Sequence, residues 1–333
     1  MKWITEYSIF EAFSKFLIKS VRFLYFSNQQ NMFRLLVSFI FLFNMAFSQN
    51  PYVVVLGIAQ DGGYPQAGCK KECCKAVWDK KIRPQLVSCI ALVDPISNEK
   101  WIFDATPDFT QQQFELSSLT KNDTELNGIF LTHAHIGHYT GLMYLGRETM
   151  GAKMIKVYAM PKMKIFLENN GPWSQLVKLQ NMDIQPIVEE KEIILNDRLK
   201  VMAFKVPHRD EFSETVGYKI ISKNKTLVFI PDIDKWQKWN KDLKKVVNEN
   251  DYLLLDGTFY QDGEIDRPMS EVPHPFVTET MHILSDLPKS EKQKVNFIHF
   301  NHTNPIIKSN SKESKTLKVE GFNVSIQNQK LEL

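Results

Sequence analysis

Residues 128–138 carry the sequence Gly-Ile-Phe-Leu-Thr-His-Ala-His-Ile-Gly-His. The first four residues form an apolar run that predicts a buried strand, and a helical pattern begins near Tyr139. Side chains that follow the carboxyl end of a strand point into the crevice beside the sheet, where a neutral imidazole can present its lone pair to a metal. His133, His135 and His138 can all face this space. Three imidazoles so close together would be costly to protonate, and a bound divalent cation removes that cost.

Residues of the kinds that bind metals also follow four later apolar strands, each within one or two positions. These residues are His208, Asp232, Asp256 and His302. A single such residue is more often a helix cap or a hydrogen-bonded loop residue. The repetition is much less expected by chance, so the strand ends predict a metal site assembled from distant parts of the chain.

The remaining pattern predicts a layered α/β protein with mixed sheets. Short β-branched and aromatic runs recur between residues 52 and 326, and helical patterns at 108–119, 139–150, 161–169, 235–249 and 275–287 interleave with them irregularly. Some neighbouring strands are spaced like hairpins and others are separated by a helix, which argues against a pure doubly wound sheet. No repeat or linker is apparent after residue 50, so we expect one domain over residues 50–333.

The charge of the chain argues against a nucleic-acid partner. The sequence holds 41 basic and 38 acidic residues, of which five and two lie in residues 1–48, so the rest has 36 of each. Binding to nucleic acid depends on neutralising many phosphates, and a neutral body without a basic run cannot do this well. We therefore expect a small-molecule substrate. The oligomeric state is left open.

The N-terminal 48 residues resemble an export signal. Arg34 precedes an apolar run at 35–43, which is too short for a comfortable membrane span of about 20 residues. Ala46 and Ser48 would stand at positions −3 and −1 of a cut before Gln49. Either the true start is Met32 and the segment is a cleaved signal peptide, or residues 1–48 form an uncleaved anchor. Both alternatives predict an exported body, periplasmic or secreted, that is attached to a membrane only if the segment remains.

Four cysteines allow three interpretations. Cys69, Cys73 and Cys74 lie within six residues, and Cys89 follows on a predicted strand. An even count in an oxidising compartment favours a disulfide, whereas a tight cluster can hold structural zinc with one ligand from elsewhere. Free buried thiols are the third alternative.

The motifs together resemble the metallo-β-lactamase superfamily over about residues 52–305. The similarity lies in the Thr-His-x-His-x-x-His turn at 132–138 and in the later strand-end His, Asp and His. The opening Leu-Gly-Ile-Ala-Gln-Asp-Gly-Gly-Tyr-Pro at 56–65 and Asn-His-Thr-Asn-Pro at 301–305 are similar to one branch, which holds the pyrroloquinoline quinone biosynthesis protein B group and the phosphodiesterases of phosphonate breakdown. The resemblance implies a four-layer αββα sandwich of two mixed sheets.

The resemblance also implies a set of metal ligands for one or two divalent ions, with zinc expected and manganese or iron as alternatives at the second site. The implied ligands are His133, His135 and His208 on the first metal, His138 and His302 on the second, and Asp232 bridging both. Asp104 and Asp256 would orient ligand imidazoles, with a capping or loop role as the alternative. His282 falls within a helical pattern and His299 lies inside a strand predicted over 295–300, so both are expected to be structural.

Two positions depart from the implied pattern. The superfamily has a metal-binding Asp at the position of Gly137, so the second site would keep two imidazoles and one shared carboxylate, an open set closer to the facial triad that holds iron. His274, in Val-Pro-His-Pro at 272–275, matches no ligand position. It would meet the substrate, or simply lie in a loop fixed by prolines.

The expected function is metal-assisted hydrolysis of an ester, lactone or phosphodiester bond. A bound metal lowers the pKa of water from about 16 to about 7, and Asp232 could orient the resulting hydroxide. His274 is a candidate to protonate the leaving group. The alternatives are an iron-dependent oxidative or hydroxylating enzyme, as the similarity to the quinone-biosynthesis group allows, and a non-catalytic binding or carrier protein on the same scaffold. Segments 148–182 and 261–275 are the expected pocket walls.

Overall fold

The computed structural model describes residues 49–120, 125–266, 268 and 271–333. The predicted export segment, residues 1–48, lies outside the described residues and stays a prediction. Residues 50–333 form one compact unit. Within the described part, no helix is both long enough and apolar enough to cross a membrane.

The first half of the body and the C-terminal strand build a seven-stranded sheet in the order β14-β1-β2-β3-β4-β5-β6. Its strands are β1 (Tyr52–Gly57), β2 (Cys89–Asp94), β3 (Glu99–Phe103), β4 (Gly128–Phe130), β5 (Ile155–Ala159), β6 (Met182–Pro186) and β14 (Lys330–Glu332). The pairs among β14, β1, β2 and β3 are antiparallel, and those from β3 to β6 are parallel.

The second half builds another seven-stranded sheet, in the order β13-β12-β11-β10-β9-β8-β7. Its strands are β7 (Glu192–Ile194), β8 (Leu199–Lys205), β9 (Val216–Ser222), β10 (Thr226–Ile230), β11 (Tyr252–Asp256), β12 (Val295–Ile298) and β13 (Asn323–Val324). The neighbouring strands from β7 through β10 pair antiparallel, and the neighbouring strands from β10 through β13 pair parallel. The expected mixture of hairpins and crossovers is confirmed in both sheets.

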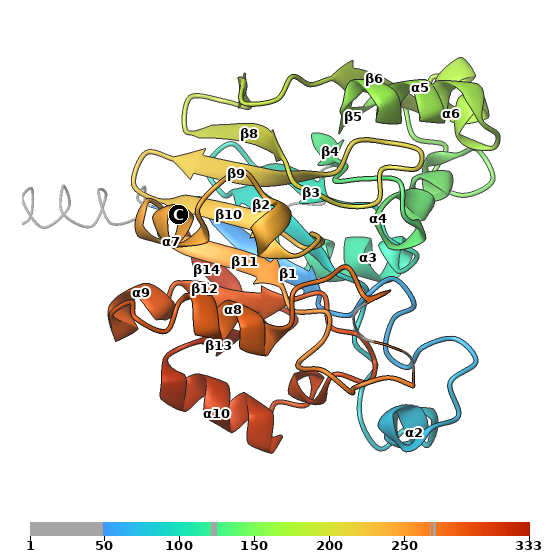
Figure 1. Cartoon of the computed structure of the whole chain (residues 1–333). Coiled ribbons are helices and arrows are strands. Elements are labelled where there is room, and N and C mark those ends of the chain that lie inside the picture. Colours follow the sequence, from blue (N-terminus) through green and yellow to red (C-terminus); the bar gives the residue numbers. More distant parts are fainter. Residues whose placement is uncertain (1–48, 121–124, 267, 269–270) are drawn as a thin grey trace, which may run out of the picture. The chain divides into compact units, whose positions relative to one another are not determined.

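Successive side chains of β1 point alternately into two different cores, which explains how the layers pack. Val53 and Val55 belong to the core shared with the second sheet, whereas Val54 and Leu56 belong to a separate core beneath the helices of the first half. A strand points successive side chains to opposite faces, so a strand that is apolar throughout must be covered on both sides. The sheets therefore pack face to face, with helices outside each, which confirms the predicted four-layer sandwich (Figure 1).

Most of the helices divide between the two outer layers according to these cores. The first half contributes α2 (Glu72–Trp78), α3 (Phe109–Leu119), α4 (Ile136–Tyr139), η1 (Thr140–Leu145), α5 (Pro161–Asn169) and α6 (Trp173–Lys178). The second half contributes η2 (Trp236–Lys238), α7 (Leu243–Asn248), α8 (Val277–Ile283), α9 (Lys289–Lys292), η4 (Pro305–Ile307) and α10 (Lys312–Glu320). Buried residues of α3, α5 and α6 join the core of the first sheet, and those of α7, α8 and α10 join the core of the second. The exception is α2, which lies in the first half but whose buried Cys74 and Val77 join the core shared with the second sheet.

Two predicted helices are each divided into two shorter ones, and the helix predicted at 275–287 is shortened to α8 (Val277–Ile283). The pattern at 235–249 is split into η2 and α7, and the side chain of Asp242 caps α7 by accepting a hydrogen bond from the Lys244 amide. An Asp at this position satisfies an otherwise unpaired amide at a helix start, so it marks a new helix. The pattern at 139–150 becomes α4 and η1. Gly141, at the start of η1, lies so close to the Thr106 carbonyl that an added Cβ would be 2.2 Å from its oxygen.

The strand directions bring six strand ends to one edge of the sandwich. The parallel pair β3 and β4 ends at Phe103 and Phe130, and the parallel group β10, β11 and β12 ends at Ile230, Asp256 and Ile298. β8 ends nearby at Lys205. All candidate ligands predicted from strand ends follow these six strands, so the topology brings the two halves of the sequence together at this edge.

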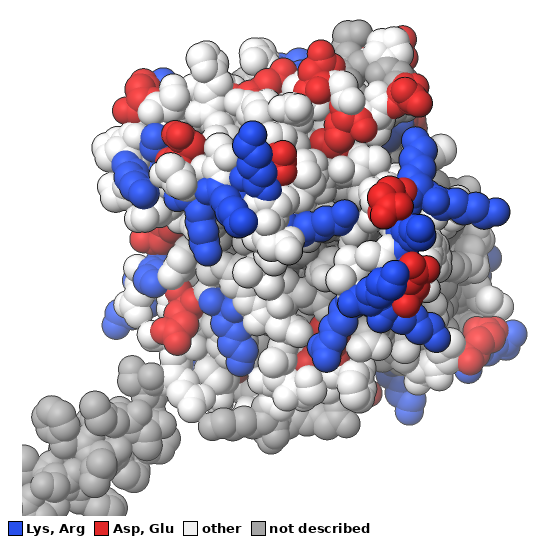
Figure 2. Space-filling view, turned by 90° about the horizontal axis from the view of Figure 1, so that it is seen from below, with Lys and Arg blue, Asp and Glu red and all other residues white. Residues whose placement is uncertain are grey.

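The charge distribution agrees with the neutral composition of the body. Figure 2 shows Lys and Arg side chains interspersed with Asp and Glu over the face that carries α10 and α2 in its foreground. No continuous basic surface is visible on this face. A mixed surface of this kind does not attract a polyanion strongly.

An aromatic group holds the two sheets together, and it generates a test of the fold. The ring of Phe103 stacks on Phe130 at 4.9 Å and meets Tyr218 and Phe229 edge to face at 5.3 and 6.3 Å. We expect Phe103→Ala to lower the free energy of unfolding by about 3–5 kcal/mol, because it leaves a cavity between the sheets. Urea denaturation measures this change. Phe114→Ala is the matched control: this ring is 70% exposed, so its loss should change the value by less than about 0.5 kcal/mol.

Candidate metal centre

The first group of converging side chains contains His133 and His135 from the turn after β4, His208 after β8 and Asp232 after β10. His135 Nδ1 lies 2.8 Å from His133 Nε2 and 3.2 Å from His208 Nε2. Asp232 Oδ2 lies 3.4 and 3.3 Å from the same two Nε2 atoms. Three ring nitrogens and one carboxylate oxygen thus surround a single point, an arrangement that suits a four-coordinate divalent cation.

The other ring nitrogen of each of these imidazoles has a partner that fixes its orientation. His133 Nδ1 bonds to Thr132 Oγ1 at 3.0 Å, His135 Nε2 to Glu211 at 3.3 Å and His208 Nδ1 to Asp234 at 3.1 Å. A neutral imidazole that donates outward keeps a bare lone pair on its inward nitrogen. The three inward nitrogens are therefore oriented as metal ligands.

A second group lies beside the first and contains Asp61, His138 and His299. His138 Nε2 is 3.2 Å from Asp61 Oδ1 and 4.0 Å from Asp232 Oδ2, and His299 Nε2 is 3.7 Å from Asp61 Oδ1. The carboxylate of Asp232 therefore borders both groups, as the sequence analysis expected of a bridging residue. The described structure assigns no hydrogen bond to His138 Nε2, His299 Nε2 or Asp61 Oδ1, although all three atoms are buried.

Partners outside the second group fix its tautomers too. Asp104 Oδ2 accepts from His138 Nδ1 at 2.7 Å, which leaves Nε2 of a neutral ring bare. Thr258 Oγ1 donates its proton to Asp256 Oδ1 at 2.6 Å, so at 2.9 Å it must accept from His299 Nδ1. Asp104 and His299 both have positive φ, 70° and 68°, a backbone conformation that costs a non-glycine residue about 1–3 kcal/mol and clusters at functional sites.

The electrostatics of the two groups differ. Burial, together with the neighbouring His138, holds the pKa of His133 well below its usual range, so this ring stays neutral. Burial also opposes protonation of His138, but Asp104 and Asp61 outweigh it and raise the pKa of that ring well above its usual range. Burial likewise opposes ionisation of Asp232, yet the neighbouring His208 and His274 lower its pKa well below its usual range. The site is thus arranged to hold positive charge between ionised carboxylates.

His274, which matched no ligand position, lies beside Asp232. Its Nδ1 bonds to Asp256 Oδ2 at 2.8 Å and lies 3.2 Å from Asp232 Oδ1. Asp256 also accepts hydrogen bonds from Ile233 and Thr258, so its carboxylate is fixed on several sides. Of the two carboxylates predicted to orient imidazoles, Asp104 therefore contacts the ring of a candidate ligand, whereas Asp256 orients His274.

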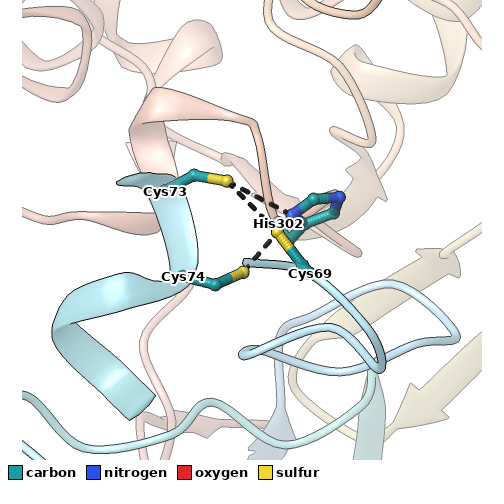
Figure 3. A group of neighbouring side chains, drawn as sticks. All are labelled: Cys69, Cys73, Cys74 and His302. Carbon is teal, nitrogen blue, oxygen red and sulfur yellow. Dashed lines mark hydrogen bonds between the residues drawn. The ribbon is translucent and has the colours of Figure 1, made fainter. Parts of the chain in front are cut away.

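His302 does not join this centre, which corrects its predicted place beside His138. Its Nδ1 lies 3.4 Å from the Sγ atoms of both Cys73 and Cys74, and Cys69 Sγ is 3.7 Å from Cys73 Sγ (Figure 3). The reason is the end of β12 at Ile298, two residues earlier than the predicted end. His299 is thereby the first residue beyond the strand and faces the metal centre, while His302 lies in the following turn.

The cysteine group has the composition and spacing of a structural zinc site. Tetrahedral zinc with Zn–S of about 2.3 Å and Zn–N of about 2.0 Å separates two sulfurs by about 3.8 Å and a sulfur from a nitrogen by about 3.5 Å. The observed separations are close to these values. Burial, reinforced by the neighbouring thiols, raises the pKa of Cys74 to about 12, so a cation is needed to hold it as a thiolate at neutral pH.

The cysteine alternatives can now be compared with the structure. All four cysteines are free, and no disulfide occurs in the described part of the chain. Cys89 lies apart from the other three, fully buried in β2, and donates to the Asp104 carbonyl. The zinc interpretation with one ligand from elsewhere is the alternative that fits this geometry.

Sequence analysis missed two residues of the centre. His299 was assigned to the interior of a strand, and a strand end two residues earlier would have identified it. Asp61 lies in the turn after β1, and no spacing rule points to it. Its only signal was the missing carboxylate at Gly137, which implies that another acid fills that space.

Comparisons with known proteins agree with this geometry. The coenzyme PQQ synthesis protein B of Methylorubrum extorquens strain PA1 is 26% identical over 309 residues, covering 82% of this chain and 97% of that protein. The crystal structure of Zn²⁺-bound PqqB from Methylobacterium extorquens has a TM-score of 0.72 at 25% identity, covering 85% of this chain and all of the other. A diphosphatase of the PhnP family has the same fold, with a TM-score of 0.60 at 20% identity and coverage of 86% and 98%.

A family model that matches more than half of the chain identifies the family to which this protein belongs. The model of the beta-lactamase superfamily domain matches residues 100–300, which include β3 to β12 and the turns that carry His133, His208 and Asp232. The sheet order, the strand-end histidines and this match lead to one assignment. The chain belongs to the metallo-β-lactamase superfamily, as the motifs predicted.

Proposed function

We propose that this protein is a metal-dependent hydrolase that cleaves an ester, lactone or phosphodiester bond of a small molecule. The observation that carries the proposal is the pair of adjacent groups of inward-facing nitrogen and oxygen atoms, with Asp232 in the first group and 4.0 Å from His138 of the second. The superfamily contains many hydrolases, including phosphodiesterases, which supports an enzyme of this class. The zinc in the related PqqB structure supports the binding of a divalent metal by this chain.

The residues fit divalent cations because each buried imidazole has one nitrogen fixed outward and one lone pair turned inward. Bound there, a divalent metal would supply a hydroxide nucleophile at neutral pH and polarise the bond under attack. His133, His135, His208 and Asp232 would hold one ion, and His138 and His299 would contribute to a second. Asp232 has a carboxylate that is buried and ionised, so it can orient a nucleophile between the two groups.

We assign the proton transfer to His274. Its Nδ1 is engaged by Asp256, so Nε2 is the nitrogen available to a substrate. A positioned imidazole that donates a proton to a leaving oxygen accelerates hydrolysis by about 10²–10⁴-fold. Asp256 in turn would stabilise the charged ring and keep it in one orientation.

A second candidate is an oxidative or hydroxylating enzyme that uses iron. The similarity to coenzyme PQQ synthesis protein B, which extends over 97% of that protein, favours it. Metal analysis separates the two candidates: zinc or manganese in the histidine centre supports hydrolysis, whereas a single redox-active iron supports oxidation.

Export of the protein also stays a proposal, and N-terminal sequencing of the mature protein tests it.

The first prediction concerns the two paired histidines. We expect His133→Ala, His135→Ala to remove at least one metal ion per chain and to lower hydrolysis of the best substrate at least 10²-fold, because two of four donor atoms are lost. Metal content is measured by mass spectrometry after dialysis, and activity with a panel of chromogenic phosphodiesters, lactones and esters.

The matched control is His282→Ala, which removes an exposed imidazole on α8 that belongs to none of the candidate ligand groups. This variant should keep the metal content and activity of the parent. Unchanged metal content in the double variant would rule out the metal centre, and with it the hydrolase.

The second prediction concerns His274. We expect His274→Asn to lower kcat by about 10²–10⁴-fold for substrates with poor leaving groups and much less for nitrophenolate esters, which leave without a proton. The metal content should not change. An equal loss for both kinds of substrate would show that His274 positions the centre instead of donating a proton.

The third prediction concerns the cysteine group. We expect Cys73→Ser to release one zinc ion per chain and to lower stability, by about 2.7 kcal/mol when free zinc is at 100 times Kd. Thermal unfolding and zinc release to a chromogenic chelator measure both effects. Cys89→Ala should keep the zinc, because this thiol lies outside the group. Equal zinc content in the Cys73→Ser variant and its parent would contradict the assignment.

A further inference from the structure

We propose that Asp61 is the carboxylate ligand of the second metal and takes the role of the acid that the superfamily motif has at the position of Gly137. The inference rests on the metal centre of the proposed function and deepens it. It adds a carboxylate to the second site, which then consists of Asp61, His138 and His299. Asp232 lies beside this group, with Oδ2 at 4.0 Å from His138 Nε2, and would be the shared ligand.

The close contact between Asp61 and Gly137 supports the replacement of an acid at residue 137 by Asp61. A Cβ added to Gly137 would lie 2.2 Å from Asp61 Oδ1, 2.9 Å from its Cγ and 2.7 Å from its Cα. No side chain at residue 137 is compatible with Asp61 in its observed position. The carboxylate of Asp61 thus occupies the volume into which an acid at 137 would project.

The turn that carries Asp61 is fixed to the strand end that carries His299. Gln60 N donates to the Phe300 carbonyl at 2.8 Å, and Phe300 N donates to the Ile58 carbonyl at 2.7 Å. The Asn301 side chain also donates to Gln60 Oε1 at 2.6 Å. These bonds place the carboxylate and the His299 ring against each other without help from their own contact.

Within the described part of the chain, the atoms that meet in this space have no hydrogen-bond partner. The outward nitrogens of His138 and His299 are engaged by Asp104 and Thr258, so in its neutral form each ring turns a bare lone pair toward the oxygen of Asp61. Lone pairs that face one another in a buried site repel unless a cation lies between them. Ligand distances of about 2.1 Å in tetrahedral geometry separate two donor atoms by about 3.4 Å, close to the observed 3.2 and 3.7 Å.

The competing explanation is that the cation is a proton. His138 would then be an imidazolium paired with Asp104 and Asp61, and His299 would bind no cation. This explanation requires neither a second metal nor any effect of Asp61 on metal binding, so the two explanations predict different stoichiometries.

The test compares the parent with Asp61→Asn, which keeps the size of the side chain and removes its charge. Both proteins are loaded with Co²⁺ and Zn²⁺ in separate experiments, and metal content and affinity are measured by dialysis and competition with a chelator. We expect the parent to bind two ions in the histidine centre. Asp61→Asn should lose one of them or bind it at least tenfold more weakly. Thiolate bands of Co²⁺ report the cysteine group separately and should not change.

The control is Asp262→Asn, an exposed residue that, like Asp61, precedes a glycine in a turn. It should bind metal as the parent does. Gly137→Ala gives a second, independent test, because its Cβ would displace Asp61 while leaving every ligand in the chain. It should lose the same ion, and circular dichroism verifies that each variant is folded.

Three outcomes are informative. Loss of the second ion in both variants supports the inference, whether or not a substrate for hydrolysis has been found. Two ions bound with parental affinity in Asp61→Asn overturn it and leave the proposed hydrolase intact. Fewer than two ions in the histidine centre of the parent also overturn it, and no metal there at all would remove the proposed function as well.

Discussion

The arrangement of the centre depends on one constraint: buried imidazole lone pairs cannot face buried carboxylates without positive charge between them. Each ring has its outward nitrogen engaged, by Thr132, Glu211, Asp104, Asp234, Asp256 or Thr258, so the orientation of the inward atoms is determined by the protein itself. The cost of this assembly without a cation is electrostatic repulsion among largely buried groups. Divalent cations remove that cost, which couples metal binding to the stability of the fold.

Both candidate metal sites join the two halves of the sandwich. In the histidine centre, His133, His135 and His138 come from the first half of the sequence, and His208, Asp232 and His299 come from the second. In the cysteine group, the thiols of Cys69, Cys73 and Cys74 meet the imidazole of His302 across 228 or more positions of sequence. Ligands that are distant in sequence lose much conformational entropy when they meet, so cross-links of this kind stabilise most where they close long loops.

Most ligands of the histidine centre could be predicted from the sequence. Short apolar strands followed at once by His or Asp identify His133, His135, His138, His208 and Asp232, because parallel strands bring their carboxyl ends to one edge. His302 was predicted at the second metal site, where the structure has His299. The cause is the end of β12 at Ile298, two residues before the predicted end, which changes the histidine that faces the centre. Asp61 could not be identified from spacing, since it meets His138 and His299 only through tertiary contact. The partner of the cysteines was unpredictable for the same reason.

The position of Asp61 links the two metal sites physically. An acid at residue 137 would belong to the same turn as His138 and would depend on nothing else. Asp61 instead belongs to the segment that runs from β1 to the cysteines, and its neighbour Gln60 is bonded to Phe300 and Asn301, next to His302. The cysteine group holds the far end of this segment against the same turn of the chain. A cation among the thiols therefore limits how far Asp61 and His299 can separate, so the structural site helps to define the geometry of the second ligand set.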